Sequence, residues 1–244
     1  MIPIHDSERS RSFPYVNVAI IAINIVVFIY ELSLQGQSIA PRVTELDRFI
    51  AHWGNIPACT LDALGRHVDL TLRGVATCDA QPHPAWTLIT AMFMHGGWLH
   101  ILGNMLFLWI FGDNVEDAMG HVLYAVFYLL VGVIAGFTHM LVNADALTPA
   151  IGASGAIAGV MGAYIVLYPR ATVAVLVPIF FFIPLPVPAF LLIGFWFLLQ
   201  LFSGAADLGA NTAGVAYFAH VGGFIAGAAL VNVFAWPWRP RRRA

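Results

Sequence analysis

Residues 151–164 read IGASGAIAGVMGAY, an apolar run of small residues with one serine, Ser154. One interpretation is a glycine-rich helix that packs tightly and carries a serine without chemical purpose. The other is a nucleophile placed at the start of a helix. The rest of the chain decides between them, because this stretch alone is compatible with both.

The composition predicts a polytopic membrane protein of the all-α class. Of the 244 residues, 60% are hydrophobic and 10% are charged, whereas soluble domains carry roughly a quarter charged residues. The formal net charge is −2, and no basic patch with interleaved aromatic residues is present in the sequence. Nothing therefore supports a nucleic-acid partner.

Six apolar segments are suited to cross a membrane as the helices of one bundle. They are 15–33, 87–111, 121–142, 153–169, 187–203 and 214–235. The apolar stretch 171–183 is shorter, and Pro184, Pro186 and Pro188 follow it. Proline breaks a helix, so we expect 171–183 to be a loop at the membrane interface rather than a seventh span.

Arginines near the ends of the spans predict the orientation, because positive residues collect on the cytoplasmic side. Arg9 and Arg11 precede the first span, Arg170 follows the fourth, and the end of the chain is arginine-rich. With six spans, both termini are then cytoplasmic. The first apolar run could instead be a cleaved signal peptide, but it lacks a convincing small-residue cleavage site, so we expect it to be retained as a span.

The expected organisation is one membrane domain with a large first external loop. Both cysteines, Cys59 and Cys78, lie in that loop. An oxidising exterior would permit a disulfide between them, and two free thiols are the alternative. The expected segments are 1–14 as the cytoplasmic N-terminal segment, 15–235 as the domain, 34–86 as the external loop and 236–244 as a basic cytoplasmic tail.

Polar residues inside a span are costly, so each is a candidate for function. The second span contains HGGWLHILGN, with His95, His100 and Asn104. The fourth begins with GASG around Ser154, and the sixth contains AHVGGFIAG with His220. On the six-span topology these three spans all run from outside to inside, and each cluster lies early in its span. The three clusters are therefore expected at similar depth.

The spacing of small residues predicts which helices touch. Stripes of small residues four positions apart let membrane helices approach closely. Such stripes occur in the fourth and sixth spans, at Gly155, Gly159, Ala219, Gly223 and Gly227. Close approach of these two spans would bring Ser154 near His220. His100 and Asn104 are four residues apart and so share one face of the second span.

This combination fits nucleophilic catalysis. A serine hydroxyl becomes a good nucleophile when a base takes its proton, and His220 can be that base and later protonate the leaving amine. The oxyanion then needs donors. The free backbone N–H groups at the helix start of Ser154 can serve, together with His100 and Asn104. No Asp or Glu lies at this depth in the second, fourth, fifth or sixth span, so a Ser–His dyad is expected.

Each residue also has an alternative interpretation without catalysis. A lone serine in a span usually hydrogen-bonds its own helix backbone, and Asn104 could join helices. Metal chemistry is a competing enzyme class, but the chain has no HExxH motif. A histidine site would lack any nearby carboxylate, so no metal or cofactor is expected. Its members would be His95, His100, His139 and His220.

Taken together, GASG, AHVGG and HGGWLHILGN resemble the motifs of the rhomboid family of intramembrane serine proteases. The resemblance covers the chain from the second span to the sixth, in the family's order. It implies a six-helix bundle with a water-filled cavity open to the outer side of the membrane. It also implies, as substrates, single-span or other transmembrane proteins cleaved in or next to their membrane segments.

The resemblance also assigns roles to individual residues. It implies Ser154 as nucleophile and His220 as base, an oxyanion site of His100, Asn104 and the Ser154 backbone, and supporting roles for His95, Gly152 and Gly155. The fifth span, 187–203, would be a lateral gate, and 203–214 a flexible cap over the site. One position departs from the family pattern: Ala158 stands where an aromatic residue often packs on the catalytic histidine.

The alternative function is that of a non-catalytic, rhomboid-like membrane protein, which would bind or transport a ligand through the same polar pocket. By analogy with compact six-span rhomboids, we expect the protein in a prokaryotic inner membrane. The expected active site opens to the outer side.

Overall fold

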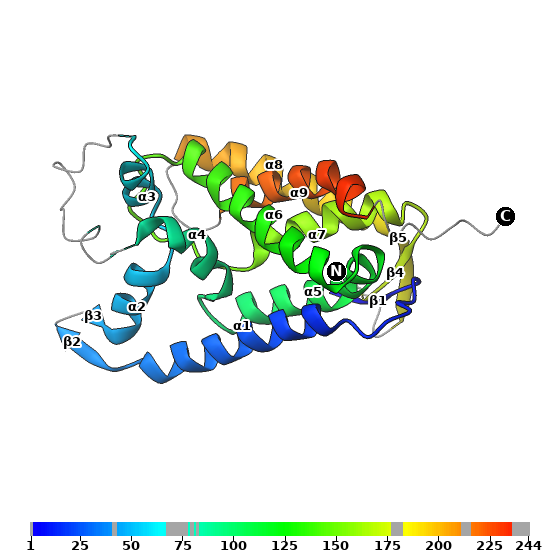
Figure 1. Ribbon diagram of the computed structural model, residues 1–244, viewed down its shortest axis with the longest axis horizontal. Coiled ribbons are helices and arrows are strands. Elements are labelled where there is room, and N and C mark those ends of the chain that lie inside the picture. Colours follow the sequence, from blue (N-terminus) through cyan, green and yellow to red (C-terminus); the bar gives the residue numbers. More distant parts are fainter. Residues whose placement is uncertain are drawn as a thin grey trace.

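The computed structural model describes residues 2–40, 43–66, 78, 81, 83–176, 183–210 and 216–235. The predicted basic tail 236–244 lies outside the described residues, as do parts of the external loop 34–86 and of the cap 203–214. The described chain is mostly a bundle of helices, with a small sheet at one end (Figure 1). Its long helices are α1 (Tyr15–Leu34), α5 (Trp98–Met119), α6 (His121–Val142), α7 (Ser154–Leu167), α8 (Ala189–Ala210) and α9 (Tyr217–Phe234).

Within the part of the chain that the structure describes, four helices are long and apolar enough to cross a membrane. These are α1, α6, the part of α8 from Ala189 to Ala206, and α9. They correspond to four of the six predicted spans. The fourth predicted span, 153–169, is the apolar helix α7 of 14 residues. At 1.5 Å per residue α7 is about 21 Å long, which is shorter than the roughly 30 Å hydrocarbon core of a bilayer.

The second predicted span, 87–111, is not a continuous helix, and this part of the prediction is wrong. The chain forms the short helices α4 (Thr87–Thr90) and η3 (Ala91–Phe93), turns, and begins α5 only at Trp98. The turn ends at Gly97, whose φ of 155° is unfavourable for other residues. Helix α5 also continues beyond the predicted end, into a polar last turn.

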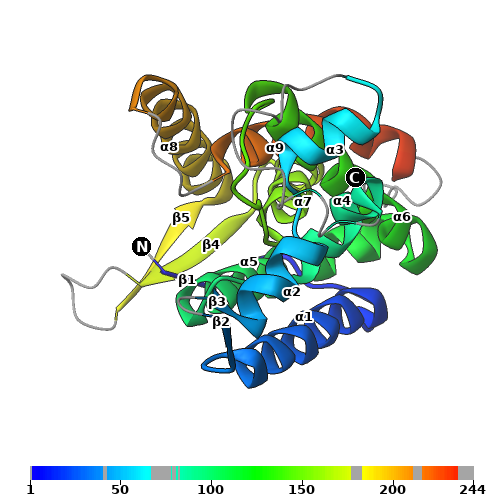
Figure 2. The ribbon, with the colours of Figure 1, turned by 90° about the vertical axis from the view of Figure 1, so that its left-hand side faces the viewer.

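Helix α7 lies in the middle of the bundle, between α5, α6 and α9 (Figure 2). Helices α7 and α9 are so close that their backbones are in contact. A Cβ atom on Gly223 would lie 2.0 Å from the carbonyl oxygen of Gly155, and one on Gly227 would lie 1.9 Å from that of Gly159. The predicted close approach of these small-residue stripes is therefore confirmed.

The predicted interface loop 171–183 is instead partly a strand. A three-stranded antiparallel sheet has the order β1 (Ile2–Asp6), β4 (Thr172–Leu176), β5 (Pro184–Pro188). Alternate side chains of β4 are buried, which is the burial pattern of a strand. The alternating prolines of β5 share one side of this edge strand, so their missing N–H groups can all face away from β4.

Strand β1 is also tied to the bundle by Asp6. The Tyr164 hydroxyl of α7 donates to this carboxylate, and Asn114 Nδ2 of α5 donates to it at 2.9 Å. Burial raises the pKa of Asp6 to about 6, although the hydrogen bond from Tyr164 acts in the opposite direction. The N-terminal strand is thus held by a carboxyl group whose pKa is raised by burial.

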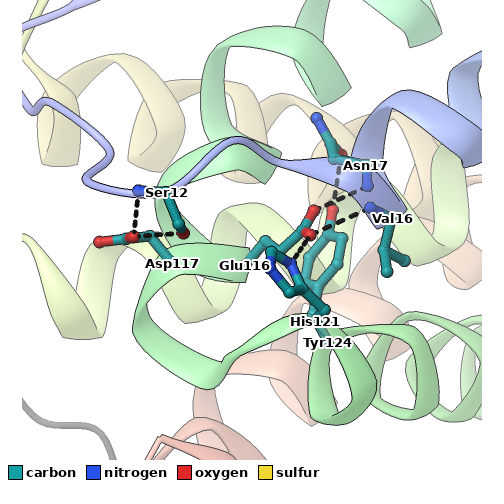
Figure 3. Close-up of polar contacts among 7 residues, drawn as sticks. All are labelled: Ser12, Val16, Asn17, Glu116, Asp117, His121 and Tyr124. Carbon is teal, nitrogen blue, oxygen red and sulfur yellow. Dashed lines mark hydrogen bonds and ion pairs between the residues drawn. The ribbon is translucent and has the colours of Figure 1, made fainter.

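The start of α1 is held by a buried carboxylate (Figure 3). Glu116 of α5 accepts hydrogen bonds from the backbone N–H groups of Val16 and Asn17, at 3.0 and 2.7 Å. These donors have no partner within their own helix, and the helix dipole favours a negative charge there. His121 contacts the same carboxylate, and the Tyr124 hydroxyl donates to Asn17, so α1, α5 and α6 are joined at this end.

The segment after α1 contains short elements outside the bundle. They are β2 (Ser38–Ala40), β3 (Val43–Thr44), α2 (Glu45–Trp53), α3 (Pro57–Ala63) and η2 (Pro84–Trp86). Thr44 and Asp47 form a capping box at the start of α2. Cys59 and Cys78 form a disulfide, which resolves the two alternatives that the sequence allows.

The predicted cap loop 203–214 is helical in its first part. Helix α8 continues through Ser203 to Ala210, and 211–214 lie outside the described residues. Alanine and leucine in this stretch favour helix and outweigh its two glycines. The predicted fifth span, 187–203, therefore starts about where α8 starts but ends about two turns before it.

Candidate active site

Ser154 and His220 form a direct hydrogen bond between two helices. Ser154 is the first residue of α7, and His220 lies in the first turn of α9. The distance from Ser154 Oγ to His220 Nε2 is 2.7 Å. The close backbone contact of α7 with α9 at Gly155 and Gly223 permits this proximity, because neither glycine has a side chain to hold the two helices apart.

Gly152 brings the start of α7 against His100. Its φ is +131°, and a Cβ atom there would lie 2.8 Å from His100 Nε2 and 3.6 Å from Ser154 Oγ. The backbone N–H of Gly96 donates to His100 Nδ1 at 3.3 Å. A ring nitrogen that accepts cannot carry a proton, so Nε2 of the neutral ring carries it and faces the Gly152–Ser154 backbone.

Asn104 lies one turn after His100 on α5 and is buried. Its Nδ2 donates to the backbone carbonyl of His100 at 3.0 Å. A carboxamide nitrogen carries two hydrogens, so this bond to the helix leaves one for another acceptor. The contact orients the Asn104 side chain within α5.

His95 is a buried residue that packs against the ring of His100. Its ring meets the His100 ring edge-on, with centroids 5.0 Å apart, and only 3% of the residue is exposed. Its backbone N–H donates to the carboxylate of Glu31 on α1, at 3.1 Å for the nearer oxygen. Glu31 is a buried acid that no sequence motif indicates, although its place in the apolar first span is itself a signal.

Two residues of α8 also contact His220. Gln200 Oε1 lies 2.7 Å from His220 Nδ1, and the Trp196 ring lies with its centroid 5.6 Å from that of the imidazole. Trp196 thus supplies the aromatic contact that Ala158 cannot. Neither residue belongs to a motif, but Gln200 is the lone carboxamide in the apolar run 189–202, which marks it as a candidate.

A cavity of about 50 Å³ lies beside Ser154. Asn55 and His139 contribute polar side chains to its otherwise largely apolar wall, which also includes Gly152 and Gly155. This volume is sufficient for a water molecule. Among the described residues, no group of three or more His, Cys, Asp or Glu side chains is arranged to hold a metal ion.

The fold and this site define a polytopic helical membrane protein with a Ser–His pair in its interior. The Rhomboid domain matches residues 82–237, which is more than half of the chain. The chain therefore belongs to the rhomboid family, which includes serine proteases.

Similar proteins come from plants and yeast. RHOMBOID-like protein 1 of Arabidopsis thaliana is 29% identical over 157 residues, which cover 62% of this chain and 39% of that protein. RHOMBOID-like protein 6, mitochondrial, of the same plant is 40% identical over 85 residues, covering 34% and 26%. Rhomboid protein 1, mitochondrial, of Saccharomyces cerevisiae is 29% identical over 147 residues, covering 58% and 39%. The chain thus spans about two fifths or less of these relatives.

Proposed function

We propose that the protein is an intramembrane serine endopeptidase with a Ser154–His220 dyad. The observation that carries the proposal is the 2.7 Å hydrogen bond between Ser154 Oγ and His220 Nε2, in the interior of an apolar bundle. A serine bonded to a base is the arrangement that activates a hydroxyl nucleophile. Membership of the rhomboid family supports the same chemistry.

The proposed hydrolysis of a peptide bond uses the two hydrogen-bonded atoms, Ser154 Oγ and His220 Nε2. His220 Nε2 takes the proton of Ser154 Oγ while the oxygen attacks the carbonyl carbon of the scissile peptide bond. The same nitrogen then gives that proton to the leaving amine, and an acyl-enzyme remains. Water then attacks the carbonyl carbon of the acyl-enzyme and gives a proton to His220 Nε2. The ester bond to Ser154 Oγ breaks, His220 returns that proton to Oγ, and the carboxyl product leaves. The cavity beside Ser154 is a place from which such water can come.

The proposed oxyanion site has three sources of donors. The Ser154 backbone N–H is free at the start of α7, where the helix dipole favours negative charge. His100 is the second source. Its Nδ1 accepts a hydrogen bond from Gly96, so its proton is on Nε2, which lies beside the Gly152–Ser154 backbone. The remaining Nδ2 hydrogen of Asn104 is the third. His95 and Gly155 act indirectly, by holding His100 and by bringing α7 close to α9.

The proposed substrates are single-span or other transmembrane proteins. Helix α7 is too short to cross the hydrocarbon core, so Ser154 at its start would lie below the membrane surface. We propose a six-helix bundle of the bacterial type, formed by α1, α5, α6, α7, α8 and α9, with both termini in the cytoplasm and a site open to the outer side of a prokaryotic inner membrane. The distribution of arginines supports the orientation.

The proposal is tested by cleavage of a single-span reporter protein in detergent or liposomes. Ser154→Ala should abolish cleavage, because it removes the nucleophile. Ser33→Ala is the matched control: Ser33 is exposed near the C-terminal end of α1, and its hydroxyl donates to the Tyr30 carbonyl. Cleavage by Ser154→Ala at the wild-type rate would refute the serine mechanism. Absence of cleavage by the wild type would favour the non-catalytic binding protein.

A further inference from the structure

We propose that Gln200 is the positioning residue of the dyad, holding His220 in the tautomer that can accept the serine proton. The inference rests on the proposed protease function and adds a third residue to its machinery. Among the described residues, no carboxylate is hydrogen-bonded to His220, and a carboxamide from α8 takes the place of the third triad member.

The geometry accounts for both ring nitrogens of His220. Nε2 lies 2.7 Å from Ser154 Oγ, and Nδ1 lies 2.7 Å from Gln200 Oε1. A carboxamide oxygen can only accept, so Nδ1 must carry the proton. In the neutral ring Nε2 is then unprotonated and receives the serine hydrogen. His220 is only 7% exposed, so little bulk water competes for either nitrogen.

The alternative arrangement would be inactive. If the Gln200 carboxamide were turned over, its NH₂ group would donate to Nδ1, and Nε2 would carry the proton. That nitrogen could then donate to Ser154 but not accept from it. The orientation of one amide therefore decides whether the dyad contains a base, which makes the tautomer of His220 a direct test.

Gln200 lies on the face of α8 that packs on α9, and this packing fixes its position. This face includes Ile193, Trp196, Phe197 and Gln200, at the spacing of one side of a helix. Ile193 is fully buried, and Phe197 stacks on Phe224 of α9 with ring centroids 4.4 Å apart. The other side of α8 consists of exposed apolar residues, and Figure 2 shows the helix at the edge of the bundle.

This placement couples the position of α8 to the state of the base. A shift of α8 away from α9 by about 1 Å would stretch the 2.7 Å contact beyond hydrogen-bonding distance. His220 Nδ1 would lose its hydrogen bond to Gln200 although α9 had not moved. The contact of Gln200 with His220 is therefore present only while α8 is packed on α9.

The kinetic test compares three variants of the full chain on the reporter. Gln200→Leu keeps the size of the side chain but removes the acceptor, and we expect kcat to fall about 10- to 100-fold with KM little changed, since full loss of a base costs roughly 10²–10⁴-fold. Gln200→Glu retains an accepting oxygen and should recover most of this loss. Leu199→Ala, on the exposed face of α8, is the control. Wild-type kcat in Gln200→Leu, or equal losses in the Leu and Glu variants, would overturn the proposal.

A spectroscopic test does not depend on proteolysis. The full chain is labelled with ¹⁵N-histidine, and the signals of His220 are assigned by their loss in His220→Ala. We expect Nδ1 to be protonated and Nε2 unprotonated in the neutral ring, and this preference to weaken in Gln200→Leu. A protonated Nε2 in the wild type, or an unchanged tautomer in Gln200→Leu, would overturn the inference even if the protein cleaves its reporter. If the tautomer is as expected but the wild type cleaves nothing, the proposed function fails and the role of Gln200 in orienting the ring stands.

Discussion

Replacement of Gly223 by alanine should separate the two halves of the dyad. The new Cβ atom would lie 2.0 Å from the Gly155 carbonyl oxygen, whereas ordinary contact begins at 3.4 Å. Because the obstacle is backbone, α9 has to move away from α7 by about 1.4 Å at this point. His220 is one turn away, so its 2.7 Å contact with Ser154 should lengthen to about 4 Å, which is no longer a hydrogen bond.

The expected loss of reporter cleavage for Gly223→Ala is roughly 100-fold, within the range for loss of a general base. Overpacking should also lower the free energy of unfolding by about 1–3 kcal/mol. Gly194→Ala is the matched control, because a Cβ atom at Gly194 in α8 has no neighbour within 4 Å. Both variants are compared by cleavage rate and by thermal unfolding in the same detergent. Near-wild-type cleavage by Gly223→Ala would refute the claim that backbone contact of α7 and α9 assembles the dyad.

Three other predictions concern separate parts of the molecule. Asn104→Ala should raise the barrier to cleavage by about 2.7–4 kcal/mol and leave measurable activity, since other oxyanion donors remain; a wild-type rate would remove Asn104 from that site. Because burial raises the pKa of Asp6 to about 6 from an ordinary 3.8, the folded protein binds this proton more tightly than the unfolded chain. The contribution of Asp6 to stability should therefore be fully present below about pH 4 and be lost, by about 1–2 kcal/mol after allowance for partial exposure, as pH rises through 6. Asp6→Asn should lack this part of the pH dependence in thermal unfolding. Reduction of the Cys59–Cys78 disulfide, which closes a loop of 19 residues' separation, should lower the free energy of unfolding by about 3 kcal/mol. The double Cys→Ser variant should be insensitive to reductant, and an unchanged melting temperature of the reduced wild type would contradict this.

The sequence predicts the contact at the centre of the fold because that contact depends on small residues. Glycines at four-residue spacing in two apolar spans permit a backbone approach, and the structure contains it at Gly155 and Gly223. The same pattern places Ser154 beside His220. Composition and span length also predict a helical membrane protein, since both follow directly from the apolar character of the chain.

Other features depend on tertiary contacts that a local pattern does not reveal. The break between η3 and α5 comes from the Gly97 turn inside an otherwise apolar run. Strand β4 forms because β1 and β5 pair with it, and one of these partners lies at the other end of the chain. Gln200 is the one carboxamide in the apolar run 189–202, and only the packing of α8 on α9 reveals that it meets His220.

The central claim is that His220 activates Ser154, and labelling with a fluorophosphonate probe tests it most directly. Mass spectrometry of the labelled full chain should find a single adduct, on Ser154, in the wild type. Ser154→Ala should carry none, and His220→Ala should react slower by roughly 10²–10⁴-fold, the usual contribution of a general base. Labelling of His220→Ala at the wild-type rate, or a wild-type protein that the probe does not modify at Ser154, would contradict the account.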